Sequence, residues 1–153
     1  MKRILSLILT AFLAFAAVSA AAETMTCIIP DGQYVNVRNR AAKGAATWGE
    51  LRNGDTITPE GVTDGWVNFR FNGHDAYAMV KYFEVPENAD YVVVGDGRVR
   101  SREQPNGKRV DWVNPGDTIH VDAWRYDGNG GKWARAGSVY VSADYLEAAG
   151  DAS

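Results

Sequence analysis

Cysteine is nearly absent from this chain, since Cys27 is the single one among 153 residues. One cysteine excludes an internal disulfide, so stability must come from packing or from a bond between two copies. Free cysteine is among the residue types that proteins bury most often. We therefore expect Cys27 to be a half-buried strand residue, and a homodimer joined through Cys27 is the alternative.

Histidine is scarce as well, because His74 and His120 are the two in the chain. Two histidines and one cysteine do not form a metal site of recognisable spacing. A cysteine peptidase would need Cys27 and His74 to meet, and nothing in the sequence brings them together. The serine hydrolase motif G-x-S-x-G is also missing around Gly137-Ser138. We predict that the protein is not an enzyme and uses no metal or cofactor.

Apolar runs long enough to cross a membrane are missing too. The longest run, Ile4–Val18, follows Lys2 and Arg3 and leads into small residues up to Ala22. This order is typical of a secretory signal peptide. The run of fifteen residues is shorter than the roughly 20 that span a bilayer. We predict a cleaved signal peptide over 1–22. The exported protein then has no integral membrane segment and is extracellular, cell-wall associated or periplasmic.

The chain has no excess of basic residues. It contains 16 lysines and arginines against 19 aspartates and glutamates, which gives a formal net charge of −3. Loss of Lys2 and Arg3 with the signal peptide makes the charge more negative. An acidic protein lacks the electrostatic attraction that nucleic-acid binding requires. We therefore exclude nucleic acid as a partner.

An internal repeat is the main positive feature of the sequence. Four segments recur in the same order: Val37–Arg40 and Val99–Arg102, Asn53–Ile57 and Asn114–Ile119, Gly65–Val67 and Lys132–Ala134, Tyr77–Glu84 and Tyr140–Glu147. A period of about sixty residues is longer than that of a solenoid repeat, so each copy is expected to be a whole small domain. We predict domains over 23–85 and 90–147, joined by a short link, and a C-terminal tail over 148–153.

Within the copies, apolar and polar residues alternate. Val67, Phe69 and Phe71 alternate with polar neighbours, as in a strand with one buried face. Asn72-Gly73 predicts a two-residue hairpin turn, because both residue types accept positive φ. The segment Asp127–Gly131 predicts an enlarged hairpin loop. No helical period is sustained, so we predict an all-β fold.

The repeated segments resemble the bacterial SH3-like (SH3b) family, which opens with V-N-V-R, continues with G-D-T and G-W, and closes with Y-V-x-x-x-Y-L. The matching segments are Val35–Arg38, Gly54–Thr56, Gly65-Trp66 and Tyr77–Phe83 in the first copy, and Gly97–Arg100, Gly116–Thr118, Trp133 and Tyr140–Leu146 in the second. This resemblance implies two tandem small SH3-like barrels after the signal peptide. It also implies that the protein binds what members of this family bind, which is cell-wall peptide or glycan, or another exported protein.

Exposed aromatic and basic residues are the candidates for ligand binding. Alternation places Trp66 on the polar face of its strand and Trp133 beside Arg135, so both indoles are expected to face outward. Such rings can stack on a sugar or pack on a peptide, and arginine can meet a carboxylate. The candidate set is Trp66, Asn68, Arg70, Tyr77, Trp133, Arg135, Tyr140, Arg38 and Arg40. In the alternative, Trp66 and Trp133 only cover a barrel end or the junction between the copies.

Two functions remain open at this point. The first is a secreted, non-catalytic binding module that recognises cell-wall peptide or glycan, or an envelope protein. The second is a structural or scaffold protein, whose two barrels dock with each other and dimerise through Cys27.

Overall fold

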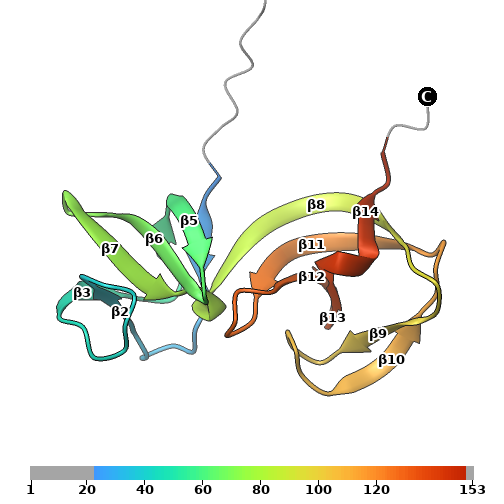
Figure 1. Cartoon of the computed structure of the whole chain (residues 1–153), viewed down its shortest axis with the longest axis horizontal. Helices are drawn as coiled ribbons and strands as arrows, with labels where there is room; N and C mark the ends of the chain where they lie inside the picture. The colour runs from blue at the N-terminus through green and yellow to red at the C-terminus, as the bar shows by residue number, and fades with distance from the viewer. Residues whose placement is uncertain (1–22, 151–153) are drawn as a thin grey trace, which may run out of the picture.

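The computed structural model describes residues 23–150 and shows an all-β fold (Figure 1). The predicted signal peptide, 1–22, and the last part of the predicted tail, 151–153, lie outside the described residues. Besides strands, the described part contains two short 3-10 helices, η1 (Val80–Tyr82) and η2 (Ala143–Tyr145). No helix within residues 23–150 is long and apolar enough to cross a membrane. The predicted fold class is confirmed.

The smaller of two sheets has five strands, all antiparallel to their neighbours. Its order is β3 (Thr47–Leu51), β2 (Val35–Arg38), β7 (His74–Met79), β6 (Trp66–Phe71) and β5 (Pro59–Thr63). The turn between β6 and β7 is Asn72-Gly73, with φ values of 47° and 80°. The predicted hairpin is therefore confirmed.

The larger sheet has nine strands and joins the two halves of the chain. Its order is β10 (Arg109–Val113), β9 (Val99–Arg102), β13 (Val139–Ser142), β12 (Lys132–Ala136), β11 (Thr118–Tyr126), β8 (Phe83–Val93), β1 (Met25–Cys27) and β4 (Thr56–Ile57), and β14 (Leu146–Ala148) pairs with β8. The long strand β8 runs from one lobe of the molecule into the other (Figure 1). We call residues 23–85 the first lobe and 86–150 the second lobe.

The residues predicted to form a short link between the domains, 86–89, lie inside β8. Pro86 is the partner of Ala123, and Ala89 is the partner of Val121, both on β11. The two lobes are thus joined by a paired strand and not by an open linker.

The strand pairings of the first lobe recur in the second. Met25 pairs with Ile57 as Tyr91 pairs with Ile119. Strand β2 and its counterpart β9 are also paired in the same way, because Arg38 pairs with Tyr77 on β7 and Arg102 pairs with Tyr140 on β13. Each lobe therefore repeats one order of hydrogen-bonded strands.

This pairing corrects the register of the first repeated segment. The sequence comparison aligned Arg38 with Arg100, whereas the pairing makes Arg102 the counterpart of Arg38. The loop after β2, residues 39–46, is two residues longer than the loop after β9, residues 103–108. The longer loop of the first lobe offsets the two-residue shift, so the spacing from the aligned arginine to the next repeated segment is equal in the two copies. The sequence comparison therefore could not reveal the shift.

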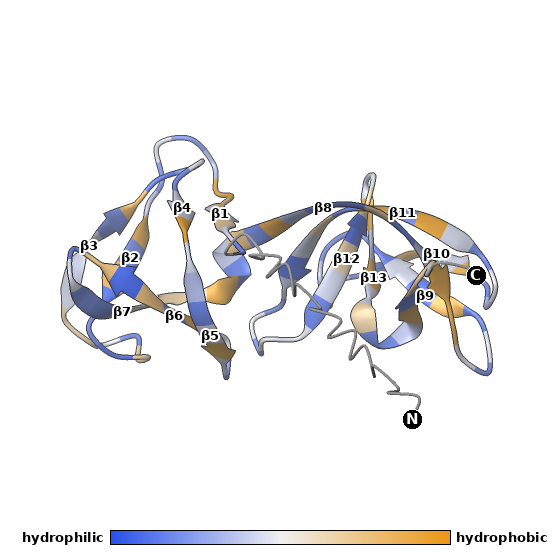
Figure 2. Cartoon of the chain, turned by 90° about the horizontal axis from the view of Figure 1, so that it is seen from above, coloured by the Kyte–Doolittle hydropathy of each residue, from blue (hydrophilic) through white to orange (hydrophobic). Residues whose placement is uncertain are grey.

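The main core fills the inner faces of the first lobe and continues across the junction. Val67 and Phe69 are buried as alternation predicted, while Phe71 is half-buried near the end of its hairpin. Val121 and Trp124 of the second lobe belong to the same apolar cluster. Figure 2 shows the hydrophobic and hydrophilic residues following one another along the strands. Since one cluster includes both lobes, each lobe contributes to the stability of the other.

Backbone contacts also connect the lobes. Gly65, in the turn between β5 and β6, has a φ of 84°, and a Cβ atom placed on it would lie 2.3 Å from the carbonyl oxygen of Gly128. Gly128 belongs to the loop Asp127–Gly131, which joins β11 to β12 as predicted. The Arg125 Nη2 group donates a hydrogen bond of 3.1 Å to the carbonyl of Lys81. Gly65 is required here by its backbone conformation and by the close approach of the other lobe.

Candidate functional site

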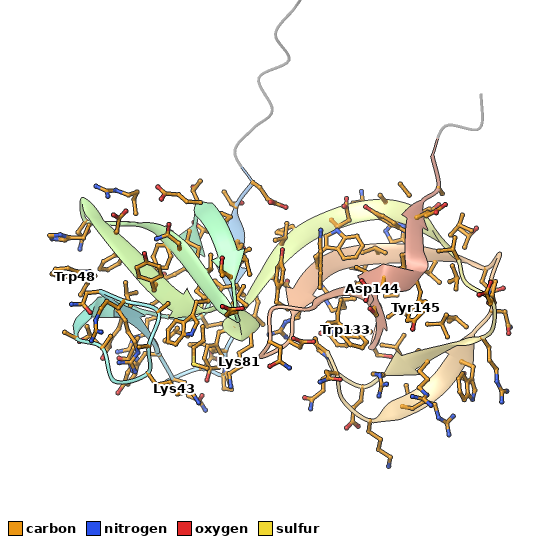
Figure 3. The ribbon with its side chains drawn as sticks, viewed as in Figure 1. Lys43, Trp48, Lys81, Trp133, Asp144 and Tyr145 are labelled. Carbon is orange, nitrogen blue, oxygen red and sulfur yellow. The ribbon has the colours of Figure 1, made fainter. Side chains whose placement is uncertain are left out.

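A pocket of about 590 Å³ lies in the second lobe. Its walls come from the loop before β9, from β9 and β10, and from the ends of β12, β13 and η2. The lining residues are Gly95, Asp96, Gly97, Arg98, Val99, Arg100, Arg102, Trp112, Trp133, Ser142 and Tyr145. Figure 3 shows Trp133 and Tyr145 near each other in this lobe. We call this pocket the second-lobe groove.

Strand alternation explains why arginines line this groove. Val99 and Ser101 of β9 are buried, with 6% and 2% of their surface exposed, so their neighbours must point to the opposite face. Arg98, Arg100 and Arg102 therefore share one face of the β9 segment. In the β9–β10 hairpin Trp112 lies directly opposite Arg100, so the indole adds to the groove wall that the arginines form.

Trp112 is surrounded by guanidinium groups. The central guanidinium carbon atoms of Arg98, Arg100 and Arg109 lie 4.2, 5.8 and 5.0 Å from the centre of its ring. These distances are within the range of a cation–π interaction. The arrangement presents several positive charges and a flat aromatic surface to the same space.

Trp133 forms the inner end of the groove. Only 9% of its surface is exposed, and its Nε1 group donates a hydrogen bond of 3.0 Å to Asp127 Oδ2. The prediction of an outward-facing Trp133 is therefore wrong, because the loop Asp127–Gly131 folds back to accept the indole. Burial acts to raise the pKa of Asp127, but the hydrogen bonds from Trp133 and from the backbone of Gly131 and Asn129 hold this pKa below its usual value.

The first lobe contains a pocket of about 310 Å³ at the corresponding place. It is lined by Tyr34, Val35, Asn36, Arg38, Lys43, Met79, Lys81 and Tyr82. The strand pairings relate Val35 to Val99 and Arg38 to Arg102, and Tyr82 ends η1 as Tyr145 ends η2. We call it the first-lobe groove. Both pockets thus share a wall made by β2 or β9, by the end of β7 or β13, and by η1 or η2, while β10 and β12 line the second-lobe groove in addition.

The charged side chains of the first-lobe groove are all basic: Arg38, Lys43 and Lys81. Arg38 is held by a hydrogen bond of 2.9 Å from its Nη1 group to the carbonyl of Ala45, and Lys81 Nζ lies 5.1 Å from the centre of the Tyr82 ring. Lys43 and Lys81 are marked in Figure 3. Both grooves are therefore basic and aromatic within a chain that is acidic as a whole. This chemistry suits a ligand with an anionic group and a flat or sugar-like part.

Three of the predicted site residues meet in another small pocket. Trp66, Asn68 and Tyr77 line a space of about 250 Å³ on the outer face of β6 and β7. Trp66 is half-buried, and the Asn68 Nδ2 group donates a hydrogen bond of 3.1 Å to the carbonyl of Ala76. Trp66 occupies the strand position that corresponds to Trp133, since Trp66 pairs with Met79 as Trp133 pairs with Ser142.

The other predicted residues are not brought into one site. Arg70 forms an ion pair of 2.8 Å with Asp75, and Arg135 lies 3.6 Å from Glu84 and 3.8 Å from Asp122. Tyr140 pairs with Arg135 across β12 and β13. Arg40 is exposed in the loop after β2 and lines neither groove. Among the nine candidates, the grooves include Arg38 and Trp133.

Several groove residues were not among the candidates: Arg98, Arg100, Arg102, Trp112, Tyr145, Tyr34, Asn36, Lys43, Lys81 and Tyr82. A signal for part of this set was present. The pattern R-V-R-S-R over residues 98–102 places three arginines on one strand face. Trp112 had no such signal, because its position depends on the register of the β9–β10 hairpin.

Cys27 lies outside the grooves and is fully buried. Burial, with a contribution from the Asp55 carboxylate, raises the pKa of its thiol to about 11. A buried thiol is poorly placed to bond a second copy, so the structure does not support the disulfide dimer. His74 is on β7, where its ring stacks on Trp48 with the ring centres 4.1 Å apart.

No protein-family model matches this chain, and a search of curated proteins finds no match either. Among solved structures, NlpC2 from Trichomonas vaginalis is 12% identical, with a TM-score of 0.37, over 82% of this chain and 47% of that one. NlpC1 from the same organism is 15% identical, with a TM-score of 0.37, over 92% and 50%. This chain spans about half the length of those two proteins. The structure titled "Endolysin LysPBC5 CBD" is 14% identical, with a TM-score of 0.32, over 85% and 96%.

Proposed function

We propose that this chain is an exported, non-catalytic binding module made of two SH3-like barrels, which recognises cell-wall peptide or glycan through the two grooves. The observation that supports this most directly is the recurrence of a basic, aromatic pocket beside β2 and η1 in the first lobe and beside β9 and η2 in the second. A surface that only filled the junction between lobes would have no reason to occur twice.

The chemistry of the grooves agrees with a wall ligand. Stem peptides of the wall carry free carboxylates, which match the guanidinium and ammonium groups of the grooves. Wall glycan offers sugar faces on which Trp112, Tyr34 or Tyr145 can stack. The resemblance of the repeated segments to SH3b domains adds the same expectation from sequence.

The scaffold function is the weaker alternative. A dimer through Cys27 lacks support because Cys27 is buried, whereas the docking of the two barrels with each other agrees with the course of strand β8 and with the shared core. An exported protein could also occupy the grooves. Co-sedimentation with peptidoglycan distinguishes the proposal from both the scaffold and a protein ligand.

The test is co-sedimentation of the purified protein with purified peptidoglycan. Trp112→Ala removes an aromatic wall of the second-lobe groove, and Tyr34→Ala removes one from the first-lobe groove. Trp48→Ala is the matched control, because this indole is 44% exposed and lines neither groove. Circular dichroism establishes that each variant is folded.

The proposal predicts that the parent protein pellets with the wall, that Trp112→Ala and Tyr34→Ala pellet less, and that Trp48→Ala pellets like the parent. Absence of pelleting by the parent would overturn the wall as ligand and favour a protein partner or a scaffold. Equal pelleting of all variants would overturn the grooves as the site.

A further inference from the structure

We infer that the second-lobe groove recognises free carboxylates of the wall peptide through Arg98 and Arg100, which line it beside Trp112. This inference rests on the proposed function and names the group that the ligand must carry. It distinguishes the second-lobe groove from its counterpart in the first lobe.

The arginines around Trp112 have no carboxylate partner in the described structure. The ion pairs among residues 23–150 involve Arg52, Arg70, His120 and Arg135 as their basic members. Arg98, Arg100 and Arg109 take part in none of these ion pairs. Three guanidinium groups within 6 Å of one ring repel one another, and an anionic ligand would relieve that repulsion.

The surroundings leave room for such a ligand. Arg98 and Arg100 are exposed and line the pocket of about 590 Å³. Asp96 is the acidic residue among those that line the pocket. Arg102 is engaged elsewhere, because its Nη1 group donates a hydrogen bond of 2.6 Å to the carbonyl of Gly107. Arg98 and Arg100 are therefore the groove arginines available to a carboxylate, and Arg109 adds a third positive charge against the Trp112 ring.

The first lobe differs at these very positions. The register that sets Trp112 opposite Arg100 sets Glu50 opposite Asn36 in the first lobe. Glu50 is paired with Arg52 at 3.1 Å, so its charge is already compensated. Tyr34, next to Val35, takes the place that Arg98 has next to Val99. The arginine cluster is thus a property of the second lobe and not of the shared fold.

Guanidinium groups bind carboxylate and phosphate alike, because both anions present two oxygen atoms that can accept two parallel N–H hydrogen bonds from the planar group. We assign carboxylate because the pocket also offers flat aromatic surfaces of Trp112 and Tyr145, which suit the peptide backbone that bears such groups. A phosphate polymer of the wall is an outcome that the test distinguishes.

The experiment uses three forms of the same wall preparation: untreated, treated with carbodiimide and ammonia to convert carboxylates to amides, and treated with hydrofluoric acid to remove phosphate polymers. The protein variants are the double change Arg98→Gln and Arg100→Gln, and a charge-matched control with Lys108→Gln and Lys132→Gln. The two control lysines are exposed and do not line the groove.

We expect amidated walls to lose binding and acid-treated walls to keep it. We expect the arginine double variant to bind untreated walls about 100-fold more weakly, since a hydrogen bond to a charged group contributes roughly tenfold in affinity. The lysine double variant should stay within about threefold of the parent.

Full binding to amidated walls together with unchanged affinity of the arginine variant would overturn this inference and leave the proposed function standing. Loss of binding after acid treatment alone would replace carboxylate by phosphate.

If the parent binds no wall at all, a soluble pair of probes still decides the question. These are acetyl-L-alanyl-D-glutamate and its neutral diamide, added to ¹⁵N-labelled protein. The inference predicts that the acid shifts the indole signal of Trp112, which is identified with Trp112→Phe, and that the diamide does not. Equal shifts from both probes, or no shift from either, would overturn it.

Discussion

The contact between the two lobes can be tested by substitution of Gly65. A Cβ atom at this position would lie 2.3 Å from the carbonyl oxygen of Gly128, which is backbone and cannot rotate away. Its φ of 84° adds a second cost, because a left-handed conformation disfavours alanine by about 1–2 kcal/mol. Overpacking at a tight contact typically costs a further 1–3 kcal/mol. We therefore expect Gly65→Ala to lower the free energy of unfolding by about 2–5 kcal/mol.

Gly73 provides the matched control for this prediction. It has nearly the same φ, 80°, but no atom lies within 4 Å of the Cβ that an alanine would add. Gly73→Ala should cost only the conformational term of about 1–2 kcal/mol. Urea unfolding followed by circular dichroism measures both variants under the same conditions. If Gly65→Ala were no more destabilising than Gly73→Ala, the two lobes would not meet at Gly128 and the reasoning would be refuted.

Three further predictions concern buried or hydrogen-bonded side chains. Cys27 should react with a thiol reagent at pH 8 only after unfolding, because burial raises its pKa to about 11; rapid reaction of the folded protein would contradict this. Hydrogen bonds from Trp124, the Asn88 backbone and Tyr91 lower the pKa of Glu87 from 4.5, so its stabilising contribution is present above about pH 4.5 and is lost as the pH falls through the lowered value. Melting temperatures between pH 3 and 6 should therefore fall less steeply for Glu87→Gln than for the parent, and identical slopes would contradict the assignment. Trp133→Phe keeps a ring but loses the donor to Asp127, and we expect a loss of about 1–2 kcal/mol in urea unfolding; an unchanged stability would show that this hydrogen bond is not formed.

Local structure was predictable where alternation and turn chemistry act within a short segment. The β6–β7 hairpin follows from the alternation around Val67 and Phe69 and from Asn72-Gly73, which has the positive φ values that the turn needs. The all-β class follows from the same patterns. These signals are local, so no tertiary information was needed to read them.

Long-range register was not predictable to the residue. The similar residues of Val37–Arg40 and Val99–Arg102 suggested one alignment, whereas the strand pairings of Arg38 with Tyr77 and of Arg102 with Tyr140 establish another. A two-residue difference in the following loop compensated for the error. A shift of two residues keeps every side chain on its original face, so alternation could not reveal it.

The site was harder to predict than the fold. Alternation placed Trp133 on an outward face, but Asp127 in the neighbouring loop accepts its indole and covers it. The arginines at 98 and 100 were visible as a one-sided pattern, yet the importance of that pattern depends on Trp112, which reaches them only through the β9–β10 register. Residues that meet through tertiary pairing leave no joint signal in a single sequence.

The central claim is that the two corresponding grooves bind the same kind of wall ligand, and backbone amide mapping tests it most directly. Soluble muropeptides released from peptidoglycan by a muramidase would be titrated into ¹⁵N-labelled protein. We expect shifts around Arg98, Arg100 and Tyr145 in the second lobe and around Asn36 and Tyr82 in the first. Shifts confined to other surfaces, such as the β6–β7 hairpin turn, or no shifts at all, would contradict it.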